Sequence, residues 1–124
     1  MDQSWAESFA RRWVRAWNAH DVEAVLAHFA EDVVFTSPVA ARVVPDSGGV
    51  IRGRAALRAY WTAALRTVPD LRFEVESLFV GVDTLMIAYR NQRGDLAAEV
   101  LEVRDGLVVR GHGAYRAAPA GTVS

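Results

Sequence analysis

The chain of 124 residues contains no cysteine and no lysine. Without cysteine there is no disulfide, no thiolate-bound metal and no cysteine nucleophile. All 14 basic residues are arginine, which we attribute to codon bias in a GC-rich genome, because alanine and valine are also abundant. No apolar run approaches the ~18 residues of a membrane-spanning helix, and the N-terminus is charged where a signal peptide is apolar. We therefore expect a cytoplasmic protein.

The sequence also lacks an excess of either positive or negative charge. The chain has 15 acidic and 14 basic residues and a net charge of −1, so its composition points to no nucleic-acid partner and no membrane partner. Hydrophobic residues make up 52% of the sequence, which is enough for one compact core in a chain of this length. We expect a single domain over residues 1–118 and a flexible tail over residues 119–124.

Two helices are predicted at the N-terminus. In residues 4–18 aromatic residues recur at every fourth position, which indicates one face of an amphipathic helix. Ser4 is predicted to cap this helix, with Glu7 completing a capping box. After the break at "NAHD", Asp21 is predicted to cap a second, shorter helix.

A strand, a loop and a third helix are predicted next. Residues 32–38, "DVVFTSP", read as a short strand that ends at its proline. Residues 39–53 contain "PDSGG" and are expected to form an irregular loop, of a length often found in lids and rims. Residues 53–68 have the spacing of a helix that buries Tyr60 or Trp61.

The C-terminal half changes to a period of two, which is typical of strands. The turn signals "GVD", "NQRGD" and "RDG" separate four such segments. These segments are residues 71–80, 83–91, 95–104 and 107–116. Helices followed by consecutive antiparallel strands predict an α+β fold, a curved sheet with helices gathered on one side.

One carboxylate interrupts the apolar face of the third of these strands, where Glu99 is in line with Leu101. A three-residue hairpin loop at residues 104–106 would pair Glu99 with Gly111 and turn it toward the helices. Gly111 and Gly113 on the same face would leave a hollow beside the carboxylate. We therefore predict an apolar pocket with Glu99 in its wall.

The residues predicted to surround this pocket come from the inward faces of the helices and strands. They are Trp13, Trp17, Phe35, Tyr60 or Trp61, Leu101 and Tyr115. Tyr89 could donate a hydrogen bond in the pocket, but it fits better as an ordinary half-buried sheet tyrosine. The three histidines lack the spacing of a metal site, so neither a metal nor another cofactor is predicted.

Three segments resemble the nuclear transport factor 2-like superfamily, and in particular its SnoaL-like branch. They are "WVRAWNAHDVEAVLAHFAEDVVFTSP", "IRGRAALRAYW" and "EVLEVRDGLVV". The resemblance covers nearly the whole chain. It implies a conical barrel in which a curved antiparallel sheet wraps around three N-terminal helices, usually as a homodimer. The superfamily includes polyketide cyclases, ketosteroid isomerases, epoxide hydrolases and dehydratases, so the resemblance implies a fold more than a reaction.

Residue by residue, the resemblance supports Glu99, which stands where the cyclases and isomerases commonly have an inward aspartate. In the isomerases this acid is protonated and hydrogen-bonds an oxyanion. Their catalytic base corresponds to Ser37, which is no base unaided, and their oxyanion tyrosine to Trp13, which can donate a hydrogen bond but not shuttle a proton. These departures argue against ketosteroid isomerase chemistry. The Asp–Arg–Asp set of the epoxide hydrolases cannot be assembled from inward positions.

Two functions stay open. In the first, the chain is an enzyme acting on a small hydrophobic molecule by isomerase- or cyclase-type proton transfer. Glu99 would move the proton, Trp13 would donate a hydrogen bond, and Ser37 and Tyr115 would orient the substrate. In the second, the same pocket belongs to a non-catalytic module for ligand binding or dimerisation, and Glu99 is a structural carboxylate.

The resemblance also implies a homodimer formed through the outer face of the sheet, because this face commonly packs on a second subunit in the superfamily. The alternative is a solvated sheet face. The residues expected there are Val100, Val108 and Ala114, ringed by Glu102, Arg110, His112 and Arg116.

Overall fold

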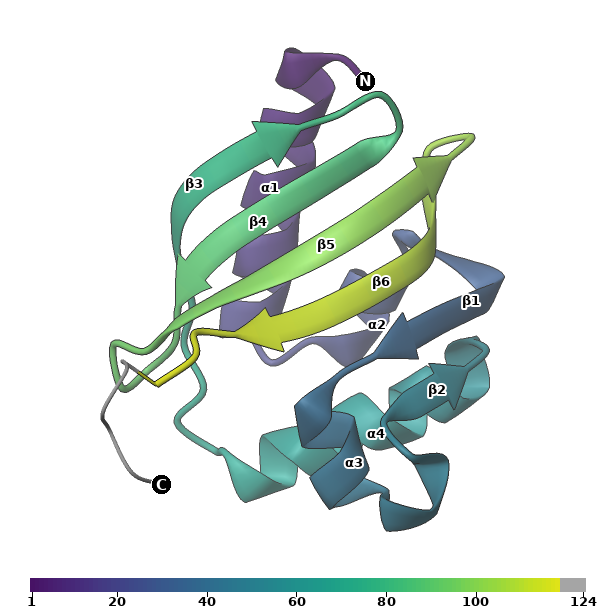
Figure 1. The fold of residues 1–124 in the computed structure, drawn as a ribbon, viewed down its shortest axis with the longest axis vertical. Helices are drawn as coiled ribbons and strands as arrows, with labels where there is room; N and C mark the ends of the chain where they lie inside the picture. Colours follow the sequence, from purple (N-terminus) through teal and green to yellow (C-terminus); the bar gives the residue numbers. More distant parts are fainter. Residues whose placement is uncertain (119–124) are drawn as a thin grey trace.

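The computed structural model describes residues 1–118 (Figure 1). The helices are α1 (Gln3–Asn18), α2 (Val22–Leu26), α3 (Pro38–Val43) and α4 (Arg54–Thr67), with a short 3₁₀ helix η1 (Pro45–Ser47). The strands are β1 (Phe29–Thr36), β2 (Val50–Arg52), β3 (Glu74–Val80), β4 (Thr84–Arg90), β5 (Leu96–Arg104) and β6 (Leu107–Tyr115). The expected tail at residues 119–124 lies outside the described residues.

The strands form one curved sheet in the order β2-β1-β6-β5-β4-β3. Strands β1 and β6 are parallel, and the other neighbours are antiparallel. Helix α1 lies behind β3, β4 and β5, and α4 lies beside β1 and β2 (Figure 1). The sheet does not close into a barrel, but the predicted α+β cone with helices on one side is confirmed. Within the described residues, no helix is both long and apolar enough to cross a membrane.

Helix α1 is amphipathic as predicted. Its buried residues follow the helical spacing and are Ala6, Phe9, Ala10, Trp13, Ala16 and Trp17. Its predicted N-cap is wrong, because the Asp2 carboxylate accepts a hydrogen bond from the Ser4 amide at 2.9 Å. The Glu7 carboxylate instead accepts one from the Gln3 side-chain amide, at 3.0 Å. Aspartate and serine cap equally well, and the cap lies two positions earlier than expected.

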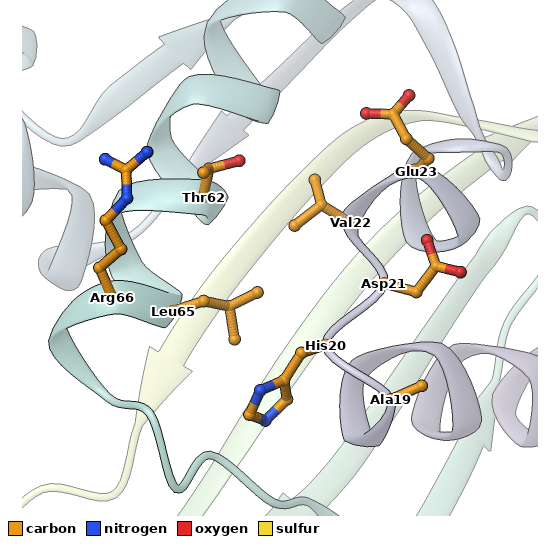
Figure 2. Close-up of a pocket in the computed structure, with 8 residues that line it drawn as sticks. All are labelled: Ala19, His20, Asp21, Val22, Glu23, Thr62, Leu65 and Arg66. Atoms are coloured by element: carbon orange, nitrogen blue, oxygen red, sulfur yellow. The ribbon is translucent and has the colours of Figure 1, made fainter.

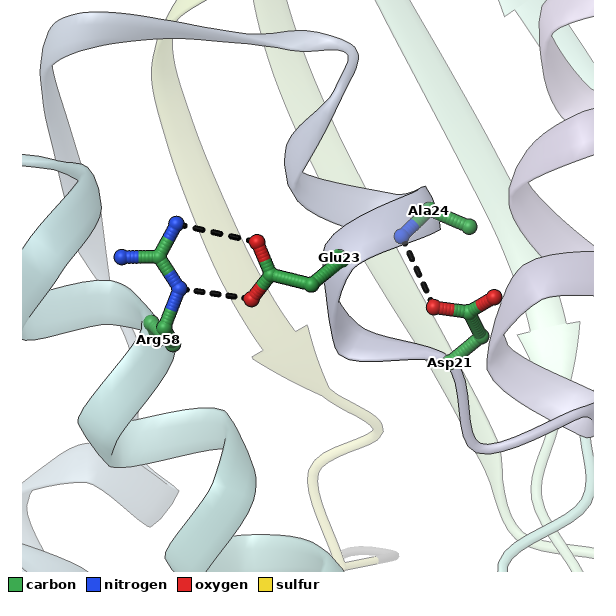
Figure 3. Close-up of polar contacts among 4 residues, drawn as sticks. All are labelled: Asp21, Glu23, Ala24 and Arg58. Carbon is green, nitrogen blue, oxygen red and sulfur yellow. Dashed lines mark hydrogen bonds and ion pairs between the residues drawn. The ribbon is translucent and has the colours of Figure 1, made fainter.

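Helix α2 is held by an N-cap and an ion pair (Figure 3). The Asp21 carboxylate accepts a hydrogen bond from the Ala24 amide at 3.0 Å, which confirms the predicted cap. The Arg58 guanidinium of α4 donates two hydrogen bonds to Glu23, at 2.6 and 3.0 Å. This paired contact fixes α2 against α4 at the surface, where both side chains are partly exposed.

The predicted irregular loop at residues 39–53 is wrong, and this segment is ordered. Ser37 caps α3 by accepting a hydrogen bond from the Val39 amide at 3.1 Å, and Pro38 occupies the first helical turn, where its missing N–H costs nothing. Residues 50–52 then pair with β1 as strand β2. Strand β1 starts at Phe29, three residues before the predicted strand.

The β5–β6 hairpin keeps the predicted face of Glu99 but not its predicted partner. A two-residue turn at residues 105–106, with both φ angles positive, joins the strands. A bulge next to Glu102 then shifts the pairing, so that Glu99 lies opposite Gly113 and not Gly111. Because the register moves by two residues, each inward side chain of β5 stays inward.

The same bulge changes the outer face of the sheet. Val108 is fully buried in the core, so its predicted position on the outer face is wrong. Val100 is half-buried and Ala114 is exposed, both on the face away from the helices. His112 is outward as expected, and its Nδ1 lies 2.7 Å from the Thr36 hydroxyl of β1.

Candidate functional site

Three cross-strand rows of inward residues run over β4, β5 and β6. The apolar row consists of Leu85, Leu101 and Gly111; the middle row of Ile87, Glu99 and Gly113; and the tyrosine row of Tyr89, Ala97 and Tyr115. The rows follow each other along the strands, two residues apart. Polarity therefore rises along the inner face, from an aliphatic end to an end that carries phenol hydroxyls.

The two glycines of these rows do not both leave space, which corrects the predicted hollow. A Cβ built on Gly111 would lie 2.8 Å from Cδ1 of Phe35 and 3.2 Å from Cδ2 of Leu101. The ring of Phe35 thus fills the place of the missing side chain. A Cβ on Gly113 would lie 3.3 Å from the Ser37 hydroxyl, and Gly113 itself lines a cavity.

Glu99 is buried, with 6% of its surface exposed. Its Oε2 has no hydrogen-bond partner among the described residues, and neither does the nearby indole Nε1 of Trp13. Burial raises the pKa of Glu99 to about 7, and the Trp13 indole N–H opposes this rise by favouring the charged form. The two groups are therefore neighbours whose geometry is not that of a hydrogen bond. A carboxyl with a pKa near neutrality can both give and take a proton.

Three tyrosine hydroxyls surround the same part of the interior. Burial raises the pKa of Tyr60 to about 12, and it also raises the pKa of Tyr89 and Tyr115. The Glu99 carboxylate contributes to each of these rises, since a negative charge nearby disfavours a phenolate. The Ser37 hydroxyl acts in the opposite direction on the pKa of Tyr60 and Tyr115. These groups therefore form one polar cluster with Glu99.

A cavity of about 1150 Å³ opens over this cluster. Of the predicted pocket residues, the structure brings seven together in its wall: Trp17, Phe35, Ser37, Tyr60, Trp61, Glu99 and Tyr115. Tyr60 and Trp61, given as alternatives, are both buried and both line it. Trp13 and Leu101 do not line the cavity, because they are fully buried behind its wall.

Aromatic side chains of the wall pack against one another. The rings of Trp17 and Trp61 meet edge to face with centroids 5.1 Å apart, and Trp61 also meets Phe35 at 5.6 Å. Phe73 and Tyr89 pack at 4.5 Å. Such pairs prefer edge-on or offset geometry and hold each other in place. The cavity is thus bounded by rings whose positions are set by one another.

The wall residues that lie outside the predicted site include Tyr89, Phe73 and Arg42. Tyr89 alternates with Leu85 and Ile87 along β4, and this period of two was the signal that could have placed it inside. Phe73 precedes β3 and is fixed there because Asn18 of α1 accepts a hydrogen bond from its amide at 2.7 Å. Arg42 belongs to α3, in the segment predicted as a loop, and no sequence signal pointed it toward a cavity.

A second hollow, between the α1–α2 junction and α4, is shallow (Figure 2). Val22 and Leu65 form its apolar part, and all of its residues are exposed or half-buried. His20 Nε2 lies 2.8 Å from the backbone oxygen of Leu71, so the ring already has a partner. This groove has neither the buried acid nor the aromatic enclosure of the main cavity. Residues 1–118 contain no group of three or more His, Asp or Glu side chains placed to hold a metal ion.

Comparison with solved structures finds the same architecture. A SnoaL-like protein of unknown function from Burkholderia thailandensis is 39% identical, with 94% of this chain and 98% of that chain covered and a TM-score of 0.87. A candidate ketosteroid isomerase from Kribbella flavida is 23% identical, with 98% and 84% covered and a TM-score of 0.71. AclR, a candidate hydroxylase from Streptomyces galilaeus, is 19% identical, with 93% and 91% covered and a TM-score of 0.72.

The last two likenesses show the fold alone, because their identity is low. No curated protein sequence matches the chain. Residues 10–117 match the model of the SnoaL-like domain. This span includes Glu99 and every strand of the sheet, and it leaves out only the first part of α1 and the residues at the two ends of the chain. The chain therefore belongs to the SnoaL-like domain family and has the nuclear transport factor 2-like fold.

Proposed function

We propose that this SnoaL-like protein binds a small, largely apolar molecule in the main cavity and that Glu99 exchanges a proton with it. The observation that carries the proposal is the buried Glu99 carboxyl at the edge of an aromatic cavity, whose Oε2 has no hydrogen-bond partner within residues 1–118. A buried ionisable group costs free energy unless it is paired, and functional sites are where such groups concentrate. Its pKa of about 7 suits a proton transfer at neutral pH.

The chemistry follows from the surroundings of Glu99. As a carboxylate in an apolar wall it is a stronger base than in water, because desolvation disfavours its charge. As a carboxylic acid it can donate a hydrogen bond to a developing oxyanion. The hydroxyls of Tyr60 and Tyr115 lie in the same cluster and offer further donors to a polar group of the ligand.

A carbon-acid probe tests this proposal without knowledge of the natural substrate. A carboxylate base opens 5-nitrobenzisoxazole by taking its ring C–H proton while the N–O bond breaks, which yields a nitrophenolate that absorbs visible light. We expect the wild type to accelerate this step over free acetate, with a rate that rises around pH 7. Glu99→Gln should lower the rate at least about tenfold.

Glu102→Gln is the matched control, because Glu102 is on the same strand and on the outer face. It should leave the rate unchanged. Equal rates for wild type and Glu99→Gln, in variants with equal unfolding midpoints, would remove the proton-transfer role and leave only ligand binding.

The second function, a binding module without chemistry, is favoured by one observation. The resemblance to the ketosteroid isomerases aligns Ser37 with their base, and the Ser37 hydroxyl already accepts the capping hydrogen bond of α3. Proton transfer in this cavity therefore rests on Glu99 without a second base from that position. Under this function Glu99→Gln binds the same ligands as the wild type, and neither protein turns over any of them.

We also propose that two copies pair through the outer face of the sheet. An apolar stripe crosses three strands there, since Met86 pairs with Val100, and Ala88 and Ala114 both flank Ala98. Such a stripe is suited to a two-fold interface. Light scattering at micromolar concentration should give the mass of a dimer, and Val100→Glu should give the monomer. A wild type that scatters as a monomer would contradict this pairing.

A further inference from the structure

The mouth of the main cavity carries an excess of positive charge. Four arginines line the cavity, against two carboxylates, Asp95 and Glu99. Arg90 is paired with Glu76 of β3 at 2.6 Å, and Arg93 lies 3.4 Å from Asp95. These two positive charges are therefore compensated locally, and the excess belongs to the remaining arginines.

Arg42 and Arg116 supply that excess. Within residues 1–118 neither makes an ion pair, and both line the cavity. Arg42 also acts on the interior, because its charge lowers the pKa of Tyr60 and of Tyr115, opposing the effect of burial. Its guanidinium is thus close enough to the polar cluster to stabilise a negative charge there.

The inner wall of the cavity around Glu99 disfavours negative charge. Glu99 is buried and its carboxylate raises the pKa of the neighbouring tyrosines, so an anionic group placed beside it would meet repulsion. Apolar rings, by contrast, match the Trp17 and Trp61 side of the wall. A ligand that carries rings and one charge is therefore oriented by the cavity, with its rings inside and its charge toward α3.

We propose that the ligand is an aromatic molecule bearing an anionic oxygen group, and that Arg42 binds this group at the cavity mouth. The proposal rests on the proposed function, since it names the class of molecule that the same cavity takes. A guanidinium presents parallel N–H donors that match two oxygens of a carboxylate or sulfonate. Arg116, at the end of β6, adds a second positive charge on the same side.

Two fluorescent probes with the same rings test the proposal. 1-Anilinonaphthalene-8-sulfonate carries a sulfonate, and N-phenyl-1-naphthylamine is the same ring system without it. We expect both to bind, with Arg42→Gln weakening the sulfonate probe about three- to tenfold and leaving the neutral probe unchanged. Added salt should weaken only the sulfonate probe. Arg11→Gln, on the exposed face of α1, is the matched control and should change neither affinity.

Plugged variants locate the binding. Ala64 and Val68 both line the cavity at the C-terminal end of α4, so Ala64→Trp and Val68→Trp should each abolish binding of both probes. Two plugs are used so that one variant with a lowered unfolding midpoint can be set aside.

The outcomes separate this inference from the proposed function. If both probes bind, are lost in a folded plugged variant and respond equally to Arg42→Gln, the cavity binds aromatic molecules but Arg42 does not select an anion, and the inference is overturned. If neither probe binds the wild type, or if both bind the plugged variants unchanged, the cavity is not the binding site and the proposed function fails with it.

Discussion

The apolar row and the tyrosine row lie on the same three strands but differ in polarity and in what lies against them. In the apolar row, Leu85 and Leu101 are fully buried, and Phe35 fills the space at Gly111. In the tyrosine row, Tyr115 is 45% exposed and Tyr89 faces a cavity. The strand pairing is uninterrupted across both rows, so the difference comes from the side chains in the rows and from those that pack on them. One end of the sheet stabilises the fold, and the other is available to a ligand.

Glu99 stands at the boundary between these two environments. Its neighbours across the strands are Ile87 and Gly113, one apolar side chain and one missing side chain. The carboxyl is therefore desolvated from one side, which raises its pKa to about 7, while the cavity reaches it from the other. At Leu101, one row toward the apolar end, a carboxyl would be sealed in the core, because that side chain is fully buried. The position between the rows gives Glu99 both an altered pKa and access.

The largest expected effect is a difference in stability between a variant of the apolar row and a variant of the tyrosine row. Leu101→Ala removes a fully buried side chain from the apolar row and should lower the free energy of unfolding by about 2–5 kcal/mol. Tyr115→Phe removes one partly exposed hydroxyl and should cost less than about 0.5 kcal/mol. Urea unfolding followed by circular dichroism measures both. Similar losses for the two variants would mean that the tyrosine row is as much a part of the core as the apolar row.

The next effect is the pH dependence of stability that Glu99 causes at the boundary between the two rows. The pKa of Glu99 is about 7 in the fold against an ordinary value of 4.5, so the folded state holds this proton more tightly than the unfolded state. Stability from this group is complete below pH 4.5 and is lost as the pH rises to about 7, at about 1.4 kcal/mol per pH unit, or about 3 kcal/mol in total.

Glu99→Gln removes this dependence. Relative to the wild type, the variant should therefore gain stability at pH 8 but not at pH 4.5, as measured by urea unfolding at both values. Glu102→Gln, on the outer face of the same strand, should show no such difference. A Glu99→Gln variant with the same relative stability at both pH values would show that Glu99 keeps an ordinary pKa.

The two glycines offer a smaller and more local comparison. Gly111→Ala places a Cβ 2.8 Å from the ring of Phe35, and this overpacking should cost about 1–3 kcal/mol. Gly113→Ala places its Cβ 3.3 Å from the Ser37 hydroxyl and toward the cavity, so a small shift relieves it and the loss should be smaller. Thermal unfolding of the pair checks this order. The reverse order would mean that the cavity end is the tighter of the two.

The sequence predicted the face of Glu99 and much of the cavity wall around it, but not which side chain fills the space at Gly111, and the reason is physical. A period of two assigns a face from local residues alone, and the β5–β6 bulge left it intact because the register moved by two. Which side chain fills the space at Gly111 depends on Phe35 of β1, a strand distant in sequence that pairs with β6 in parallel. Such a contact leaves no local pattern.

The segment from Ser37 to Gly53 shows the same limit at the level of secondary structure. Its glycines and prolines indicate a loop, yet Ser37 and Pro38 form the start of α3, and residues 50–52 become a strand because β1 offers an open edge. Helix α3 then carries Arg42 to the cavity mouth. The part of the candidate site on α1, α4, β5 and β6 was readable because these are long periodic elements. Arg42 was missed because its position depends on a short element that tertiary contacts stabilise.

The smallest losses of stability are expected for substitutions at α2 and its N-cap, away from both rows (Figure 3). Asp21→Ala removes the N-cap hydrogen bond to the Ala24 amide and should lower the free energy of unfolding by about 1 kcal/mol. Glu23→Gln weakens an ion pair with Arg58 that water screens, because both side chains are well exposed, and should leave the urea midpoint unchanged within error. A larger loss for Glu23→Gln than for Asp21→Ala would mean that the α2–α4 contact supports the helices more strongly than the cap does. It would then have to be counted with the apolar row among the parts that stabilise the fold.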